Sequence, residues 1–119
     1  MKKILTVDDS RSMLQMVSMT LRVANYEVHE AADGAIAFAM AQQQQFDAVI
    51  TDINMPNMNG IELVKALRGL PDYKFTPVLC LTTESSDDMK GQGKAAGATG
   101  WLVKPFSPEK LLGIIERLI

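Results

Sequence analysis

The feature that most constrains the fold of this chain is a fivefold alternation of short apolar runs with longer amphipathic segments. The short runs are rich in β-branched residues, which is typical of buried strands, and the segments that follow carry apolar residues at helical spacing. The predicted strands lie at residues 4–7, 26–31, 46–52, 76–81 and 101–103. The predicted helices lie at residues 13–24, 35–45, 61–69, 89–97 and 108–119. Strands joined by helices need crossover connections, so we expect an α/β fold with a doubly wound five-stranded parallel sheet.

Length and composition limit the class of protein. With 119 residues the chain is expected to form one domain over residues 1–119, without an output domain. A net charge of −2 argues against nucleic-acid binding, which needs a basic surface. No apolar run approaches the ~20 residues of a membrane span, and Ile4–Val7 is too short for the core of a signal peptide. The single cysteine, Cys80, excludes an internal disulfide and indicates a buried, unreactive thiol. We therefore expect a cytoplasmic protein.

Polar side chains follow four of the five predicted strands. Asp8 and Asp9 follow the first strand, and Asp52 ends the third. Thr82 follows the fourth strand, and Lys104 follows the fifth. The carboxyl ends of parallel strands meet at one edge of the sheet, where ligands bind in open α/β folds. The sequence therefore predicts one site at this edge.

The charges at this edge indicate a divalent cation. Three carboxylates and one lysine leave about two uncompensated negative charges, and two like charges about 4 Å apart repel by about 4 kcal/mol at an effective dielectric of 20. Oxygen ligands favour Mg²⁺, Mn²⁺ or Ca²⁺, and few carboxylates completed by water suit Mg²⁺. A carboxylate beside Mg²⁺, a lysine and a hydroxyl forms a site that accepts a phosphoryl group. Asp52 is the predicted nucleophile, with Lys104 supplying charge and Thr82 a hydrogen bond.

These motifs closely resemble a known family. Asp8-Asp9, Asp52 with the loop Met55–Gly60, Thr82 and Lys104-Pro105-Phe106 are similar to the motifs of the response-regulator receiver domains of two-component signalling. The resemblance covers the chain from end to end. It implies a flavodoxin-like fold with strand order 2-1-3-4-5.

The resemblance also implies a role for each matching position. Asp52 would be the phosphorylated residue, with Thr82 and Lys104 contacting the phosphoryl group and the Lys104–Pro105 bond cis. Trp101 takes the place of the switch aromatic, where the family usually has tyrosine or phenylalanine, so Trp is a departure that bears on how far the ring swings inward. The implied ligands of Mg²⁺ are Asp8, Asp9, Asp52 and the backbone carbonyl of Asn54.

Three further positions bear on regulation. Asn54 and Glu84 are expected to flank the route of the attacking water and to tune dephosphorylation. Thr83 stands where many relatives have a small residue, so it could narrow access to Asp52. The helix at residues 89–97 contains two internal glycines, each costing roughly 1 kcal/mol relative to alanine. We expect this helix to have low local stability and to form the output surface with Trp101 and the last helix.

Taken with the resemblance, the sequence predicts a signalling module rather than a conventional enzyme. A histidine kinase is the expected phosphodonor, and the module would catalyse only its own phosphorylation and dephosphorylation, the latter with or without a phosphatase. Among receivers the chain is most similar to the single-domain chemotaxis regulators, which implies a monomer whose partner is the flagellar motor switch. A free-standing receiver in a phosphorelay, or one that regulates another enzyme, is the alternative.

Two other classes of protein fit parts of the pattern. A Mg²⁺-dependent hydrolase of the haloacid-dehalogenase kind, with an aspartyl-phosphate intermediate, also places aspartates and a lysine at strand ends. Such hydrolases usually have a second acid two residues after the nucleophile, where this chain has Asn54. A flavodoxin-like nucleotide binder would need a phosphate loop after the first strand, where Asp8 and Asp9 would repel a phosphate.

Overall fold

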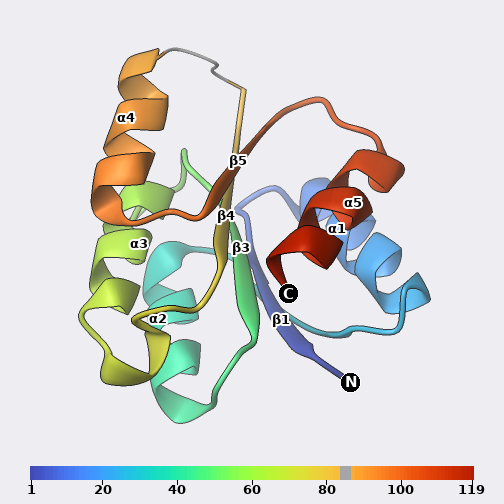
Figure 1. Cartoon of the computed structure of the whole chain (residues 1–119), viewed down its shortest axis with the longest axis horizontal. Helices are drawn as coiled ribbons and strands as arrows, with labels where there is room; N and C mark the ends of the chain where they lie inside the picture. The colour runs from blue at the N-terminus through green and yellow to red at the C-terminus, as the bar shows by residue number, and fades with distance from the viewer. Residues whose placement is uncertain (84–86) are drawn as a thin grey trace.

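A five-stranded parallel sheet forms the centre of the protein in the computed structural model, which describes residues 1–83 and 87–119. The strands occur in the order β2-β1-β3-β4-β5. Figure 1 shows the sheet edge-on between two layers of helices. They are β1 (Lys3–Val7), β2 (Glu27–Ala31), β3 (Ala48–Asp52), β4 (Val78–Thr82) and β5 (Gly100–Val103). The predicted α/β class is confirmed, and so is the strand order that the resemblance implied.

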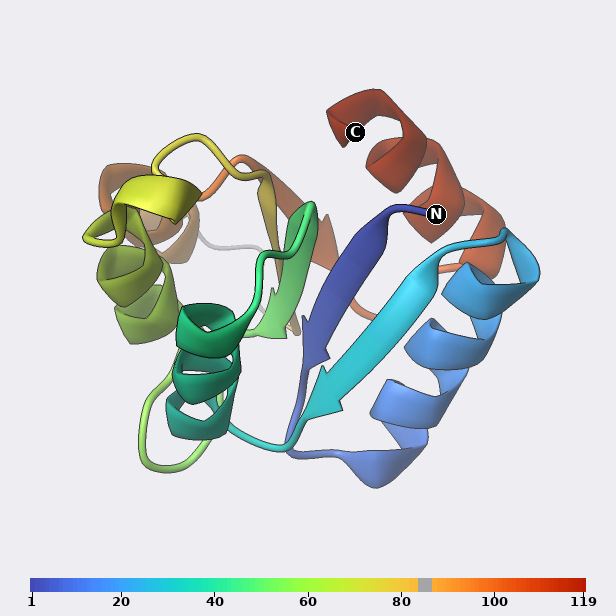
Figure 2. The same cartoon turned by 90° about the horizontal axis from the view of Figure 1, so that it is seen from below.

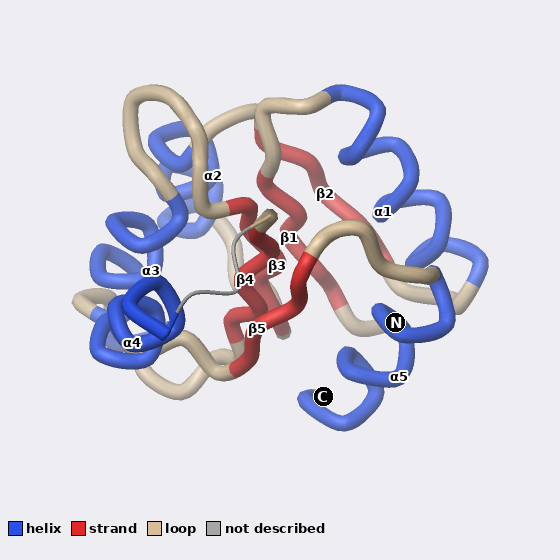
Figure 3. The backbone as a smooth tube through the Cα atoms, turned by 90° about the horizontal axis from the view of Figure 1, so that it is seen from above, coloured by secondary structure: helices blue, strands red, loops and turns tan. Residues whose placement is uncertain are grey.

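Helices cover both faces of the sheet (Figure 2). α1 (Arg11–Val23) and α5 (Pro108–Leu118) lie on one face. The other face carries α2 (Gly34–Gln43), α3 (Gly60–Arg68) and α4 (Asp87–Ala96), and a short 3₁₀ helix, η1 (Pro71–Tyr73), follows α3. Figure 3 shows α4 beside α3, on the far side of β5 from α5. None of the helices described is both long enough and apolar enough to cross a bilayer.

Two apolar clusters hold the layers together. β3 and β4 are central strands covered by helices on both faces, so every position in them is buried. Strands of this kind are rich in apolar residues because both of their faces pack against other elements. The cluster beneath α1 and α5 includes Ile4, Val17, Leu21, Ile50, Leu111 and Ile115. The cluster beneath α2, α3 and α4 includes Leu5, Ala37, Val49, Leu63, Leu67 and Ala96.

Some boundaries differ from the sequence prediction. The apolar run that was expected to start β3 begins at Phe46, but the strand begins at Ala48. Phe46 is buried because it packs beside Tyr73, whose hydroxyl accepts a hydrogen bond from the Phe46 N–H at 3.1 Å and donates one to the Gln44 carbonyl at 2.6 Å. Phe46 is therefore buried although it lies outside the hydrogen-bonded strand. The helix predicted at residues 89–97 is α4, which begins two residues earlier, at Asp87, and ends at Ala96.

The prediction for the single cysteine is confirmed. Cys80 lies at the centre of β4 with no exposed surface, and it is a free thiol. Burial raises its pKa to about 12, because the thiolate would lose its hydration. The thiol is therefore unreactive at neutral pH in the folded protein.

Candidate functional site

Three carboxylates meet at the carboxyl edge of the sheet. Asp8 directly follows β1, Asp9 comes next, and Asp52 is the last residue of β3. One oxygen from each carboxylate lies within 4.8 Å of the others. Asp8 and Asp52 are buried, with 2% and 7% of their surface exposed, whereas Asp9 is exposed. The expected juxtaposition follows from the register of β1 with β3, which pairs Val7 with Thr51.

Lys104, which follows the edge strand β5, brings a positive charge to these carboxylates. Its Nζ lies 3.1 Å from Oδ1 of Asp52 and 3.3 Å from Oδ2 of Asp8. The Lys104 backbone N–H donates to the carbonyl of Thr82 at 2.7 Å, which holds the chain against the end of β4. The bond from Lys104 to Pro105 is cis, as the resemblance implied.

Burial and charge act against each other on Asp52. The pKa of its carboxyl is raised, first by burial and second by the nearby Asp8 carboxylate, while Lys104 and the Ile53 N–H lower it. That N–H donates to Oδ1 of Asp52 at 2.9 Å, and the Ser10 N–H donates to Oδ1 of Asp8 at 2.9 Å. Lys104 therefore offsets only part of the cost of holding the acids together.

The donor set fits a divalent cation. Three carboxylate oxygens lie within 4.8 Å of one another, and burial and the neighbouring acid disfavour the anionic form of Asp52. A set of ligands made only of oxygen is the chemistry of a Mg²⁺ or Ca²⁺ site. Asn54 is exposed in the loop that follows Asp52. Asp9 is exposed as well, so water or a ligand can reach the acidic cluster at this carboxylate.

The loop from β3 to α3 is held close to Asp52. A methyl group on Gly60 would place its carbon 2.2 Å from the carbonyl oxygen of Asp52, so only glycine allows α3 to start against the end of β3. The preceding Asn59 caps α3 in a capping box with Glu62. Asn57, at φ 66°, donates from Nδ2 to Oδ2 of Asp33 at 3.0 Å, which ties the loop to the start of α2.

Thr82 and Trp101 lie on the same face of neighbouring strands. Trp101 on β5 pairs with Cys80 on β4, and Thr82 pairs with Val103. Thr82 comes two residues after Cys80, so its side chain lies on the same face of the sheet as the indole of Trp101. Thr82 is buried, whereas Trp101 is half-buried and packs on the cluster beneath α3 and α4. Thr83 is exposed, and Glu84 lies outside the described residues.

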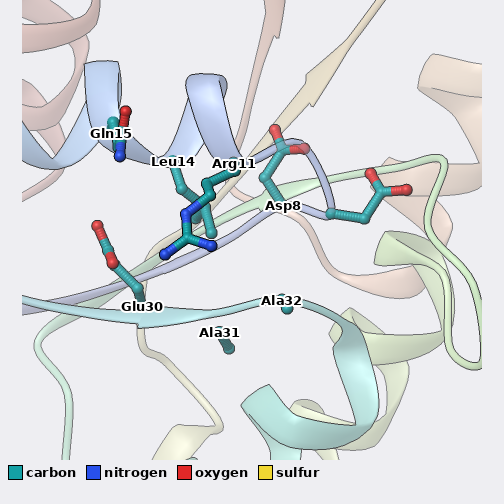
Figure 4. A pocket seen from close by; sticks show the side chains of 8 residues that line it. Asp8, Arg11, Leu14, Gln15, Glu30, Ala31 and Ala32 are labelled. Atoms are coloured by element: carbon teal, nitrogen blue, oxygen red, sulfur yellow. The ribbon is translucent and has the colours of Figure 1, made fainter.

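A cavity of about 450 Å³ borders the acidic cluster on the α1 side. Asp8 stands at one end, and Arg11 from α1 and Glu30 from β2 face the cavity from opposite walls (Figure 4). Asp9 also lines it. Neither Arg11 nor Glu30 belongs to a motif that is recognisable in the sequence. They are 19 residues apart in the chain, and no local pattern connects a surface arginine with an edge-strand glutamate.

The fold and the site together define a class of protein: a parallel α/β domain that holds an aspartate, two further acids and a lysine at the carboxyl edge of its sheet. Residues 4–116 match the response regulator receiver domain, and the chain belongs to this family. Within the family it is a CheY-like response regulator of two-component signalling. This assignment favours the receiver over the hydrolase and the nucleotide binder.

Similar proteins agree with this assignment over nearly the whole chain. The chain is 41% identical to chemotaxis protein CheY-3 of Vibrio cholerae, over 98% of its own length and 93% of that protein. The structure of Vibrio cholerae CheY4 superposes with a TM-score of 0.97 at 59% identity, covering 100% of this chain and 99% of the other. The receiver domain of sensor histidine kinase PA1611 from Pseudomonas aeruginosa, 27% identical with a TM-score of 0.92 over 98% and 96% of the two chains, holds a magnesium ion in its active-site cleft.

Proposed function

We propose that Asp52 accepts a phosphoryl group from a phosphohistidine of a histidine kinase, and that residues 1–119 act as one receiver domain. The observation that carries this proposal is the position of Asp52. It is a buried carboxylate at a strand end, within 4.8 Å of two further acids and 3.1 Å from a lysine Nζ. In a purely structural role, a carboxylate with a raised pKa would be a persistent cost.

The reaction needs alignment and charge rather than an acid or base. An Asp52 oxygen attacks phosphorus, the bond from phosphorus to the donor imidazole nitrogen breaks, and an acyl phosphate forms while the imidazole takes up a proton. Mg²⁺, when bound, would neutralise charge on the oxygens of the transferring group. The residues proposed to hold it are Asp8, Asp9, Asp52 and the backbone carbonyl of Asn54.

Lys104 and Thr82 are proposed to contact the transferred group. Lys104 already lies against Asp52 and Asp8, so a short displacement of Nζ would exchange a carboxylate partner for a phosphoryl oxygen. The Thr82 hydroxyl would donate to the same group. Because Trp101 lies on the neighbouring strand and on the same face of the sheet, movement of Thr82 would change the packing of the indole.

The output is proposed to pass through protein contact. α4, Trp101 and α5 would form the output surface, and the flagellar motor switch is the proposed partner, since similar proteins are named as chemotaxis proteins. A phosphorelay, or control of another enzyme, is the alternative. We propose a cytoplasmic monomer that loses its phosphate by hydrolysis, alone or with a phosphatase, at a rate tuned by Asn54 and Glu84.

Intact mass after incubation with acetyl phosphate and Mg²⁺ tests the proposal. The wild type should gain one phosphoryl group, and Asp52→Ala should gain none. Asp72→Asn is a matched control, because Asp72 is an exposed acid away from the cluster, and it should be phosphorylated normally. An unmodified wild type, or an adduct that persists in Asp52→Ala, would contradict the proposal.

A further inference from the structure

The indole of Trp101 packs against a notch in α4. Gly93 is buried on the face of α4 that meets the sheet. A methyl group on Gly93 would place its carbon 2.5 Å from Cζ3 and 3.1 Å from Cε3 of Trp101, with Cδ1 of Ile61 at 3.6 Å. A carbon cannot approach a ring atom to 2.5 Å, so the ring occupies space that exists only because residue 93 is glycine.

Gly91, two residues earlier in the same helix, has nothing within 4 Å of the position that a methyl group would take. Both glycines weaken the helix relative to alanine. Only Gly93 has a packing reason for its lack of a side chain. Substituting Gly91 by alanine changes helix propensity alone, whereas substituting Gly93 changes both helix propensity and the space available to the indole.

Shape, rather than hydrogen bonding, holds the indole in this notch. Nε1 of Trp101 is buried without a hydrogen-bond partner among the residues that the structure describes. A buried N–H without a partner costs free energy, because it has given up its hydrogen bond to water. The packed position thus combines favourable contacts with an opposing polar cost, so modest changes at its wall should move the ring.

We propose that Gly93 is a positioning residue for Trp101. Its notch holds the bulky indole inward and links the position of the ring to that of α4. The bulky indole on β5 fits at this position because residue 93 on α4 has no side chain. The link to signalling rests on the proposed function, whereas the notch itself does not.

Fluorescence tests the notch directly, because Trp101 is the only tryptophan in the chain. In Gly93→Ala the ring should leave the notch, so its emission should shift to longer wavelength and acrylamide should quench it more strongly. In Gly91→Ala both quantities should match the wild type, although the helix gains the same propensity. Identical spectra and quenching in the two variants would overturn the proposal.

A second measurement keeps the proposal testable if Gly93→Ala folds poorly. In a Trp101→Ala background the ring atoms that border the notch are absent, so Gly93→Ala should raise the folding equilibrium constant by about fourfold, as helix propensity predicts. With Trp101 present, the same substitution should lower it. Equal effects in the two backgrounds would show that Gly93 and Trp101 are independent and would refute the notch.

Phosphorylation separates this proposal from the proposed function. If the ring reports the state of Asp52, acetyl phosphate with Mg²⁺ should change Trp101 emission in the wild type more than in Gly93→Ala. An equal change in both would overturn the link between notch and switch. Failure of Asp52 to become phosphorylated would refute the proposed function, while the comparison of unphosphorylated Gly93→Ala and Gly91→Ala would still decide the notch.

Discussion

Replacing Asp52 by asparagine should stabilise the protein when no divalent cation is present. The substitution removes a buried negative charge and keeps the shape of the side chain. Asp52 lies within 4.8 Å of each neighbouring acid, and at that limiting distance and an effective dielectric of 20 each repulsion amounts to about 3.5 kcal/mol. The attraction to Lys104 at 3.1 Å amounts to about 5 kcal/mol on the same scale.

These terms nearly cancel, and Asp9 counts for less because it is exposed. The cost of burying the Asp52 charge then decides the sign, in agreement with the raised pKa of its carboxyl. We expect the free energy of unfolding to rise by about 1–2 kcal/mol in Asp52→Asn. Lys104 remains paired with Asp8 in this variant, so no buried cation is left without a partner.

Urea unfolding in EDTA and in Mg²⁺ is the assay. A tenfold excess of Mg²⁺ over its dissociation constant should stabilise the wild type by about 1.4 kcal/mol. The variant should gain less, having lost a ligand, so the difference between the two proteins should shrink. Asp72→Asn, the exposed control, should change stability by less than about 0.5 kcal/mol. A variant less stable than the wild type in EDTA would refute the electrostatic reasoning.

The pH dependence of this difference has a definite sign. A carboxyl whose pKa is raised by folding binds its proton more tightly in the folded state, so its contribution to stability falls as pH rises. The loss begins near the unfolded pKa of about 4 and is complete above the folded pKa. The advantage of Asp52→Asn in EDTA should therefore be small at acidic pH and largest at neutral pH. A constant difference across this range would contradict the assignment of the cost to the Asp52 charge.

Three further substitutions, two of them paired with a control substitution, test the surroundings of the site. Lys104→Met should tighten Mg²⁺ binding by about tenfold, measured by calorimetry, because a cation that repels the metal is removed; it should also slow phosphorylation of Asp52. Gly60→Ala should lower the free energy of unfolding by about 2 kcal/mol in urea, through overlap with the end of β3, whereas Gly113→Ala in open space on α5 should raise it by about 1 kcal/mol. Asn59→Ala should cost about 1 kcal/mol through loss of the α3 cap, and Asn59→Asp, which keeps the capping oxygen, should not.

The fold class was predictable because parallel sheets leave a simple record. Strands covered on both faces must be apolar throughout, and the crossovers between them must be helical. The same logic placed the acids and Lys104 together, since the carboxyl ends of parallel strands share an edge. The predicted start of β3 at Phe46 was two residues too early, because Phe46 is buried by a contact with Tyr73, 27 residues away, and not by strand pairing. An apolar run predicts which residues are buried, and some buried residues lie outside any strand.

By itself, then, the sequence determined the α/β class, the edge that carries the site and the cluster of acids around Asp52. All three follow from local patterns and from the geometry that parallel strands share. Only the tertiary structure decided the 3.1 Å contact of Lys104, the fit of Gly60 against β3 and the notch at Gly93 beneath Trp101. These depend on how closely helices settle on the sheet, a matter of fractions of an ångström between residues distant in the chain, which no local pattern specifies.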